Sequence, residues 1–375
     1  MQNRDIRFLP ALALTAAVAS ANVAASETDE LRAEMQALKQ QLAALADAVE
    51  SAPQDAHQSR VSLGGYGEMH LNLNNGDDNE IDFHRFVLFL GAELSESTRF
   101  FAELELEHSL AGDGKPGEIE LEQAYLEQDI RPGMRAKAGL FLLPVGLLNE
   151  THEPETFYGV ERNNVEKNII PTTWWEGGVA LTGELAPGVN YDLAMHSGLN
   201  TADGTIRKGR QKVAEATANK AAYTGRIRYT GVAGMEVGVS AQYQDDLMQG
   251  GGEREISASL IEAHVAYAND GFGLKALYAE WSLDKAVNAI RAGASKQNGF
   301  YIEPSYRMNN VGVFYRLSGW DNAAGNSSDS DYQRQDIGVN YWLAPTAVLK
   351  ADYFREELAD DLNATGYNLG VGYSF

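Results

Sequence analysis

From residue 61 to residue 375, apolar and polar side chains alternate with a period of two in one short segment after another. In residues 102–107, for example, alanine and two leucines alternate with Glu103, Glu105 and Glu107. A period of two places successive side chains on opposite faces of a β-strand. About sixteen such segments occur, and turn-forming clusters such as Arg-Pro-Gly and Asn-Asp-Gly separate them. The sequence therefore predicts an all-β fold of about 16 antiparallel strands.

The polar faces of these strands carry too much charge for a dry protein core. A β-sandwich would bury Glu103, Glu105 and Glu107 without partners, which costs several kcal/mol for each charge. No run of about 18 apolar residues follows the N-terminus, so helical membrane spans are not expected. A transmembrane β-barrel satisfies both faces, because lipid contacts only every second side chain. A soluble β-sandwich or repeat protein is the alternative.

Aromatic residues near the ends of the expected strands support the barrel. Such residues form girdles at the two membrane interfaces of transmembrane barrels. The positions assigned to these girdles are Tyr66, Tyr125, Trp281, Trp320, Trp342 and Tyr373.

The first 25 residues have the features of a signal peptide. Arg4 and Arg7 precede an alanine-rich apolar run, and small residues permit cleavage after Ala21 or Ala25. Residues 1–25 are therefore expected to direct export and to be removed.

Residues 27–51 follow a different period. Leucine, methionine and valine recur at alternating spacings of four and three, as in the a and d positions of a heptad repeat: Leu31, Met35, Leu38, Leu42, Leu45 and Val49. This pattern predicts a coiled-coil helix, with an amphipathic helix lying on the barrel as the alternative. Residues 52–60 have the proline and polar residues of a linker, and the barrel is expected over 61–375.

Composition excludes several classes of function. The formal net charge is -23, which argues against nucleic-acid binding, because phosphate contacts need clustered lysine and arginine. The chain has no cysteine, so it has no disulfide, thiolate metal site or thiol nucleophile. Acidic stretches at 74–80, 321–331 and 355–361 are expected to be solvated outer loops, or to bridge through divalent cations to lipopolysaccharide.

No enzyme motif stands out. The sequence lacks the Gly-x-Ser-x-Gly, His-Glu-x-x-His, phosphate-loop and dinucleotide patterns. His152 and Glu153 are adjacent, but no third ligand follows at a metal-binding spacing. The other histidines considered are scattered over strands: His70, His84, His108, His196 and His264. We therefore expect no catalysis, no cofactor and no metal.

One stretch, residues 149–178, interrupts the alternation with mixed charges and aromatic residues. Together with residues 82–94 and 139–162, it resembles the phosphate-selective porin family (porin O/P type). The C-terminal Tyr-Ser-Phe is similar to the signature that the barrel-insertion machinery reads on outer-membrane proteins. The segment before the barrel is similar to the periplasmic coiled coil of trimeric porins. The resemblance implies a trimeric, water-filled channel whose third extracellular loop, here 144–176, folds into the lumen as a constriction.

The candidate selectivity residues are charged side chains expected to face the lumen. On the strands these are Arg85, Arg99, Glu103, Glu105, Arg135, Lys137, Arg226 and Arg228. In the constriction loop they are His152, Glu153, Glu155, Arg162 and Lys167, with Trp174 and Trp175 where the loop rejoins the wall. The first four basic strand residues are expected to form one basic wall, and Arg226 with Arg228 a second. The alternative is that each basic residue pairs with a nearby glutamate. For the two tryptophans, stacking on sugars is the alternative to anchoring the loop.

The function expected is passive diffusion of small hydrophilic solutes or ions across the outer membrane of a Gram-negative cell. An anion-preferring channel for phosphate or organic acids is the first alternative, although the lysine cluster of the phosphate-selective members is absent. A structural or adhesive outer-membrane protein is the second. The expected partners are two further copies of the chain in a homotrimer, outer-membrane lipid and lipopolysaccharide, small solutes, and the insertion machinery through Phe375.

Overall fold

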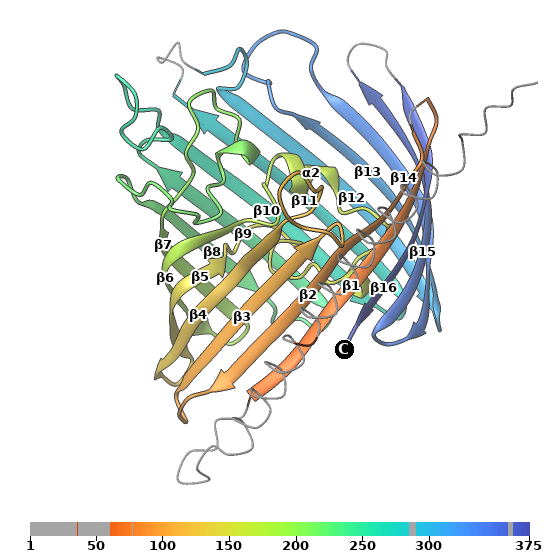
Figure 1. Ribbon diagram of the computed structural model, residues 1–375, viewed down its shortest axis with the longest axis horizontal. Helices are drawn as coiled ribbons and strands as arrows, with labels where there is room; N and C mark the ends of the chain where they lie inside the picture. Colours follow the sequence, from red (N-terminus) through yellow and green to blue (C-terminus); the bar gives the residue numbers. More distant parts are fainter. Residues whose placement is uncertain (1–35, 37–60, 77, 285–289, 359–362) are drawn as a thin grey trace, which may run out of the picture. The chain divides into compact units, whose positions relative to one another are not determined.

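The computed structural model describes residues 36, 61–76, 78–284, 290–358 and 363–375. Sixteen antiparallel strands form a closed barrel in which each strand pairs with its neighbours in sequence and β16 pairs with β1 (Figure 1). The all-β fold and the strand number expected from the alternation are confirmed. The strands are β1 (Val61–Asn74), β2 (Glu80–Glu93), β3 (Thr98–Glu107), β4 (Ile119–Arg131), β5 (Met134–Leu142), β6 (Trp175–Ala186), β7 (Val189–His196), β8 (Ala222–Tyr229), β9 (Met235–Gln244), β10 (Ala258–Asn269), β11 (Phe272–Leu283), β12 (Lys296–Met308), β13 (Val311–Asp321), β14 (Tyr332–Ala344), β15 (Ala347–Leu358) and β16 (Ala364–Ser374).

The predicted signal peptide, coiled coil and linker fall, apart from Gln36, outside the described residues and remain predictions. Within residues 61–375, the helices described are short and lie in connections: η1 (Pro154–Thr156), α2 (Asn164–Asn168) and η2 (Arg207–Gly209). None of the described helices has the length and apolar character needed to cross a membrane.

The strand connections differ in length between the two ends of the barrel. At one end they are tight turns such as 132–133, where Gly133 adopts φ +74°, a conformation that glycine tolerates at little cost. At the other end they are longer, and the two longest are 143–174 and 197–221. Short turns at one end and long loops at the other are the arrangement of bacterial outer-membrane barrels.

The outer surface of the barrel is apolar and carries aromatic residues near both ends of the strands. Tyr229, Phe272, Tyr306 and Tyr341 are exposed near the tight turns, and Tyr223, Tyr243, Phe300 and Tyr367 are exposed nearer the long loops. These two groups are placed as the girdles of a membrane barrel are.

The girdle positions expected from the sequence are mostly wrong. Tyr66, Trp281, Trp320 and Trp342 are buried on the inner face of the barrel. Trp281 packs against Trp174 of the 143–174 connection, with ring centroids 6.0 Å apart. Alternation shows which residues share a face, but here loop segments fill part of the lumen and bury large aromatic side chains inside it.

A charge on the outer face should destabilise the barrel far more than the same charge on the inner face. Val179 of β6 is 48% exposed on the outer surface, whereas Thr182 of the same strand lines an inner cavity with Asp192 and Glu150. We expect Val179→Arg to cost about 2–4 kcal/mol in folding free energy in lipid vesicles, as arginine does near a bilayer midplane. Thr182→Arg, the matched control, should cost clearly less. Equal costs in urea titrations of the two variants would contradict this assignment of faces.

Candidate functional site

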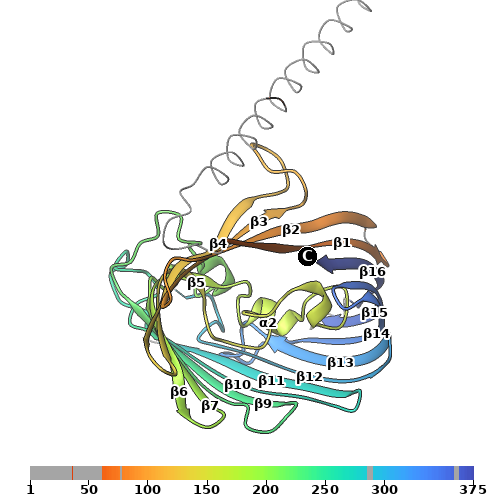
Figure 2. The ribbon, with the colours of Figure 1, turned by 90° about the horizontal axis from the view of Figure 1, so that it is seen from below.

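Residues 143–174, the constriction loop, leave the wall at the end of β5 and fold inside the ring of strands (Figure 2). Asn149 closes the base of this loop. Its Nδ2 donates to the carbonyl oxygens of Leu143 at 2.8 Å and Trp174 at 2.9 Å, and its Oδ1 accepts from the Trp174 backbone N–H at 2.7 Å. The expected loop bounds were 144–176, but Trp175 is the first residue of β6 and belongs to the wall. The loop therefore begins and ends at one hydrogen-bonded point.

Glu166 of α2 connects three parts of the molecule. Its Oε2 accepts from the backbone N–H groups of Leu147 at 2.9 Å and Leu148 at 2.7 Å, and its Oε1 accepts from the Tyr301 hydroxyl of β12 at 2.7 Å. Asn163 begins the helix by accepting from the Val165 N–H at 2.7 Å. The carboxyl group of Glu166 is buried, and burial raises its pKa despite these three donors.

Strands β13–β16 hold the middle of the constriction loop through its backbone. Lys350 donates to the Gly159 carbonyl at 2.8 Å, Asp352 accepts from the Val160 N–H at 2.7 Å, and Arg316 donates to the Tyr158 carbonyl at 2.6 Å. Near η1, Ser374 donates to Glu155 at 2.5 Å. Glu153 precedes η1 as its N-terminal cap residue. The loop therefore lies against the late strands and leaves space beside the early ones.

That space is a cavity of about 480 Å³ between the constriction loop and strands β1–β4. The 197–221 connection also reaches it. Its lining is almost entirely polar, and the charged and imidazole side chains are Glu68, His70, His84, Arg85, Glu107, His108, Glu120, Glu122, Glu161, Arg162, Glu166, Lys167, Arg207, Arg210, Lys212 and Arg334.

Four cations on the two loops face this cavity without a carboxylate partner among the described residues: Arg162, Lys167, Arg207 and Arg210. Arg162 donates to the Thr173 hydroxyl at 2.9 Å, and Arg207 donates to the carbonyl oxygens of Lys167 at 2.9 Å and Thr172 at 2.7 Å. Arg210 donates to the Thr173 carbonyl. Neutral acceptors hold the three arginine side chains in place, and none of them neutralises the positive charge by direct contact. We call these four residues the cation cluster.

The pKa values of the cluster reflect this crowding. Burial lowers the pKa of Arg207, and the like charges of Arg210 and Arg162 lower it further. Burial also lowers the pKa of Arg210, although Glu120 and Glu122 across the cavity act in the opposite direction. Arginine keeps its proton over any physiological range, so the cluster remains a local excess of positive charge.

Most of the glutamates that line the cavity or lie beside it have hydrogen-bond or ion-pair partners. Glu68 and Glu105 pair with Arg85 at 2.8 Å and 3.3 Å, and Lys212 pairs with Glu118 at 2.7 Å and with Glu120. Glu161 accepts from Asn72 at 2.9 Å and lies 3.0 Å from His70 Nδ1. Positive charge therefore predominates where the two loops meet.

The basic wall expected from the early strands is not formed. Arg85 lines the cavity, but Arg99 pairs with Glu127 and Asp129, and Arg135 pairs with Glu127, in the half of the barrel next to the tight turns. Lys137 lies over the Tyr125 ring, 4.8 Å from its centroid. The four side chains are spread along the strands because a strand advances about 3.3 Å per residue.

The second expected wall is also divided. Arg226 contacts Glu150 of the constriction loop at 2.5 Å and Asp192 at 2.8 Å, whereas Arg228 faces Glu236 at 3.6 Å nearer the tight turns.

Of the remaining loop candidates, His152 is buried between Glu103 and Glu122, and Trp174 donates its Nε1–H to Glu176 at 2.9 Å. Trp175 lines the cavity, with the Arg210 guanidinium 6.0 Å from its ring centroid.

Sequence reasoning missed the 197–221 connection. Its segment 205–212, Thr-Ile-Arg-Lys-Gly-Arg-Gln-Lys, places four basic residues within six positions, and three of them reach the cavity. This local density of positive charge in an otherwise acidic chain was a signal available in the sequence. The sequence does not show, however, that this segment faces the constriction loop, because that contact depends on the fold.

The 197–221 connection is supported by the next long one, residues 245–257. Gln249 donates to the carbonyl oxygens of Ser197 and Lys220 at 3.1 Å each, and the Thr201 N–H donates to the Leu247 carbonyl at 2.7 Å. Asp246 organises this support, because it accepts from the backbone N–H groups of Met248 at 2.9 Å, Gly250 at 2.7 Å and Ile256 at 3.0 Å.

Asp246 should make this region sensitive to acid. Burial by itself raises its pKa, but the three backbone donors outweigh burial and lower the pKa below the ordinary value. The stabilisation is therefore fully present above the unfolded pKa of about 3.9 and is lost as pH falls through the lower folded pKa. Asp246→Asn should remove about 1–3 kcal/mol at neutral pH. Hydrogen exchange at residues 245–257 measures this, and unchanged protection in the variant would contradict it.

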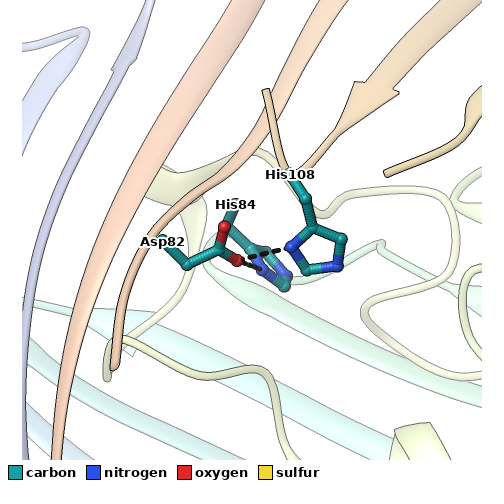
Figure 3. Close-up of side chains that lie close together, drawn as sticks. All are labelled: Asp82, His84 and His108. Atoms are coloured by element: carbon teal, nitrogen blue, oxygen red, sulfur yellow. Dashed lines mark hydrogen bonds and ion pairs between the residues drawn. The ribbon is translucent and has the colours of Figure 1, made fainter. Parts of the chain in front are cut away.

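In a second group the side chains of Asp82, His84 and His108 lie close together (Figure 3), and its two histidines line the cavity. Asp82 Oδ2 lies 3.1 Å from His84 Nδ1 and 2.8 Å from His108 Nδ1, and the His70 ring stacks on His84 with centroids 4.6 Å apart. Three of the five histidines that the sequence analysis described as scattered, His70, His84 and His108, thus come together. A register shift between β1 and β2 explains this, because such a bulge turns both His84 and Arg85 toward the lumen.

Three groups among the described residues have metal-ligating atoms within 4.8 Å of one another. They are Asp82 with His84 and His108; Glu103 with Glu122 and His152; and Glu107 with Glu118 and Glu120. The third group has Lys212 on two of its carboxylates and is an ordinary ion-pair network.

No known protein-family model matches the chain. An uncharacterized protein of Aquifex aeolicus (strain VF5) is 29% identical over 351 residues, which cover 84% of this chain and 80% of that protein. The similarity to this relative therefore extends over most of the chain.

Solved structures share the barrel at low sequence identity. An anion-selective porin from Comamonas acidovorans is similar with a TM-score of 0.62 and 13% identity, over 85% of this chain and 100% of that one. The outer-membrane channel DcaP of Acinetobacter baumannii gives 0.59 and 13%, over 84% and 97%. In-vitro folded OmpT of Vibrio cholerae, in a trimer form, gives 0.57 and 11%, over 85% and 100%. The fold of the chain is thus one that outer-membrane porins and channels have.

Proposed function

We propose that the protein is an outer-membrane porin through which small hydrophilic solutes diffuse passively. The observation that carries this proposal is the closed barrel with an inward-folded loop beside a cavity lined by charged side chains. Apolar and aromatic residues on the outer surface suit a lipid environment, and the charged inner face suits water. Diffusion through such a channel needs no catalytic group and no source of energy.

The constriction favours anions. Selectivity in a pore depends on its width and on the field at its narrowest part, where low-dielectric walls focus the charge. The cation cluster lies on the two loops that meet at the cavity, and the hydrogen bonds of its three arginines go to neutral acceptors. The porin from Comamonas acidovorans with a similar fold is anion-selective, which supports the same preference here. Small organic acids or inorganic phosphate are the solute class that this charge suits.

The protein assembles as a homotrimer in the outer membrane. The similar fold of OmpT in its trimer form and the heptad pattern of residues 27–51 support this assembly. Phe375 is 58% exposed at the end of the last strand and is suited to recognition by the insertion machinery. Acidic outer loops would contact lipopolysaccharide through divalent cations. Cross-linking of the protein with and without residues 27–51 tests whether that segment promotes trimer formation.

Recordings in planar lipid bilayers test the channel function. Purified full-length protein should insert in discrete conductance steps, three per trimer, that scale with bulk salt conductivity, because the current flows through water. A protein that inserts into vesicles and yields no conductance would contradict the porin proposal and favour a structural or adhesive role.

A further inference from the structure

Beneath the constriction loop, three buried side chains converge on one point. Glu103 of β3, Glu122 of β4 and His152 of the loop are 1%, 2% and 3% exposed. His152 Nε2 lies 3.5 Å from Glu103 Oε1 and 3.7 Å from Glu122 Oε2. Among the described residues, none of these three atoms has a hydrogen-bond partner. The loop therefore meets the wall at a cluster of unsatisfied polar atoms.

The hydrogen bonding of His152 shows what its Nε2 atom presents. His152 Nδ1 is 3.2 Å from the carbonyl oxygen of Asn149, which can only accept, so Nδ1 carries the proton. In the neutral tautomer, the form in which imidazole binds a metal, Nε2 directs a lone pair at the two carboxylate oxygens. Three acceptors facing one another without a donor repel, and burial makes the repulsion costly. A cation between them removes this cost.

We propose that Glu103, Glu122 and His152 bind a divalent transition-metal ion that fixes the constriction loop to the barrel wall. Two ligands at about 2.0–2.2 Å from a tetrahedral Zn²⁺ lie about 3.3–3.6 Å apart, close to the distances between His152 Nε2 and the two carboxylates. Histidines that bind metals usually donate their other N–H to a carbonyl or carboxylate, as His152 does to Asn149. The two carboxylates balance the charge of a dication.

The ligand set and its surroundings indicate the class of ion. One imidazole with two carboxylates suits Zn²⁺ or Mn²⁺, whereas Mg²⁺ and Ca²⁺ prefer oxygen ligands alone. Gln123 donates to Glu103 Oε2 at 2.7 Å and orients that carboxylate. Glu122 lines the cavity, which gives the ion a path and leaves a further coordination position for water. A register shift between β3 and β4 beside Glu103 places Glu122 and Gln123 together there.

The cluster in Figure 3 is the competing site, and its contacts argue against it. Both imidazole Nδ1 atoms of that cluster already contact Asp82 Oδ2, so its hydrogen bonding is complete without an ion. In the buried cluster, the atoms that face one another lack partners. Neither group has the spacing of a known metal-binding motif, because its ligands come from more than one segment of the chain.

Metal titration of refolded full-length protein in detergent, after treatment with a chelator, tests the proposal. Competition with a chromogenic chelator should show one Zn²⁺ per chain. His152→Gln and Glu122→Gln should each weaken binding at least about 10-fold, since even outer hydrogen-bond partners of metal ligands contribute that much. His108→Gln, the matched control from the competing cluster, should leave the affinity unchanged.

Two further readouts keep the test decisive. Glu122→Gln keeps the side-chain shape and removes one repelling charge, so the variant should fold at least as well without metal as the original protein. Zn²⁺ should slow hydrogen exchange at residues 149–154 in the original protein and not in Glu122→Gln. Absence of Zn²⁺ binding, or binding that His108→Gln abolishes and His152→Gln does not, overturns the proposal. Neither measurement depends on channel activity.

Discussion

Replacing Arg207 and Arg210 together by glutamine should reduce the ratio of anion to cation permeability about 10-fold. Both side chains face the cavity, and their hydrogen-bond acceptors are backbone carbonyl groups. At separations of about 8 Å and an effective dielectric constant of 20–40, one charge changes the energy of a permeating ion by about 1–2 kcal/mol. Salt screening reduces this value, so two charges together give roughly one order of magnitude. Reversal potentials under a salt gradient measure the ratio.

The same connection offers a matched control. Lys208 of η2 lies between Arg207 and Arg210 in the sequence. Its side chain is exposed and does not line the cavity. Lys208→Gln removes the same type of charge and should leave selectivity nearly unchanged. The double lysine variant of Arg207 and Arg210 keeps the charge and loses the arginine hydrogen-bond geometry, so it should retain anion preference. Equal shifts in Lys208→Gln and in the double glutamine variant would show that overall loop charge, not the cation cluster, controls permeation.

Replacing Glu166 by leucine should release the constriction loop from the wall. The substitution leaves the N–H groups of Leu147 and Leu148 and the Tyr301 hydroxyl without their acceptor in a buried site. Unpaired buried donors cost about 1–3 kcal/mol each, and the total is comparable to the stability of a local segment. We expect a larger and noisier single-channel conductance, because the loop no longer holds one position, together with cleavage of residues 143–174 by added protease.

Tyr301→Phe provides the graded comparison for this effect. It removes one of the three donors and keeps the ring, so it should cost only about 1 kcal/mol and leave the conductance nearly unchanged. A Glu166→Leu channel with the original conductance and protease resistance would mean that the backbone contacts from Lys350, Asp352 and Arg316 hold the loop without Glu166.

The sequence predicted the wall well because alternation carries most of the information about a strand. Leu104 is exposed and Glu105 is buried, as a period of two requires for an apolar outer face and a charged inner face. The interruption at residues 149–178 also coincides with the segment that leaves the wall. The expected loop, 144–176, ends two residues too late because Trp175 and Glu176 already pair with β5.

The details of the site could not be predicted, for reasons that particular residues show. Register shifts in the pairing of β2 and of β4 turn neighbouring residues to one face, so simple alternation misplaces His84 or Arg85. The cation cluster forms only where Arg162 and Arg207, 45 positions apart in the sequence, meet across two loops. The inward-facing Trp281 shows that aromatic content alone does not distinguish a lipid girdle from a packed loop contact.

The reversal potential of the unmodified protein in a potassium chloride gradient tests the central claim most directly. The claim is that the cation cluster makes the constriction prefer anions. A planar bilayer with tenfold different salt concentrations on its two sides should give a zero-current potential with the sign set by chloride. A zero-current potential with the sign set by potassium would show that the glutamates of β1–β4 control the field, and would contradict the account.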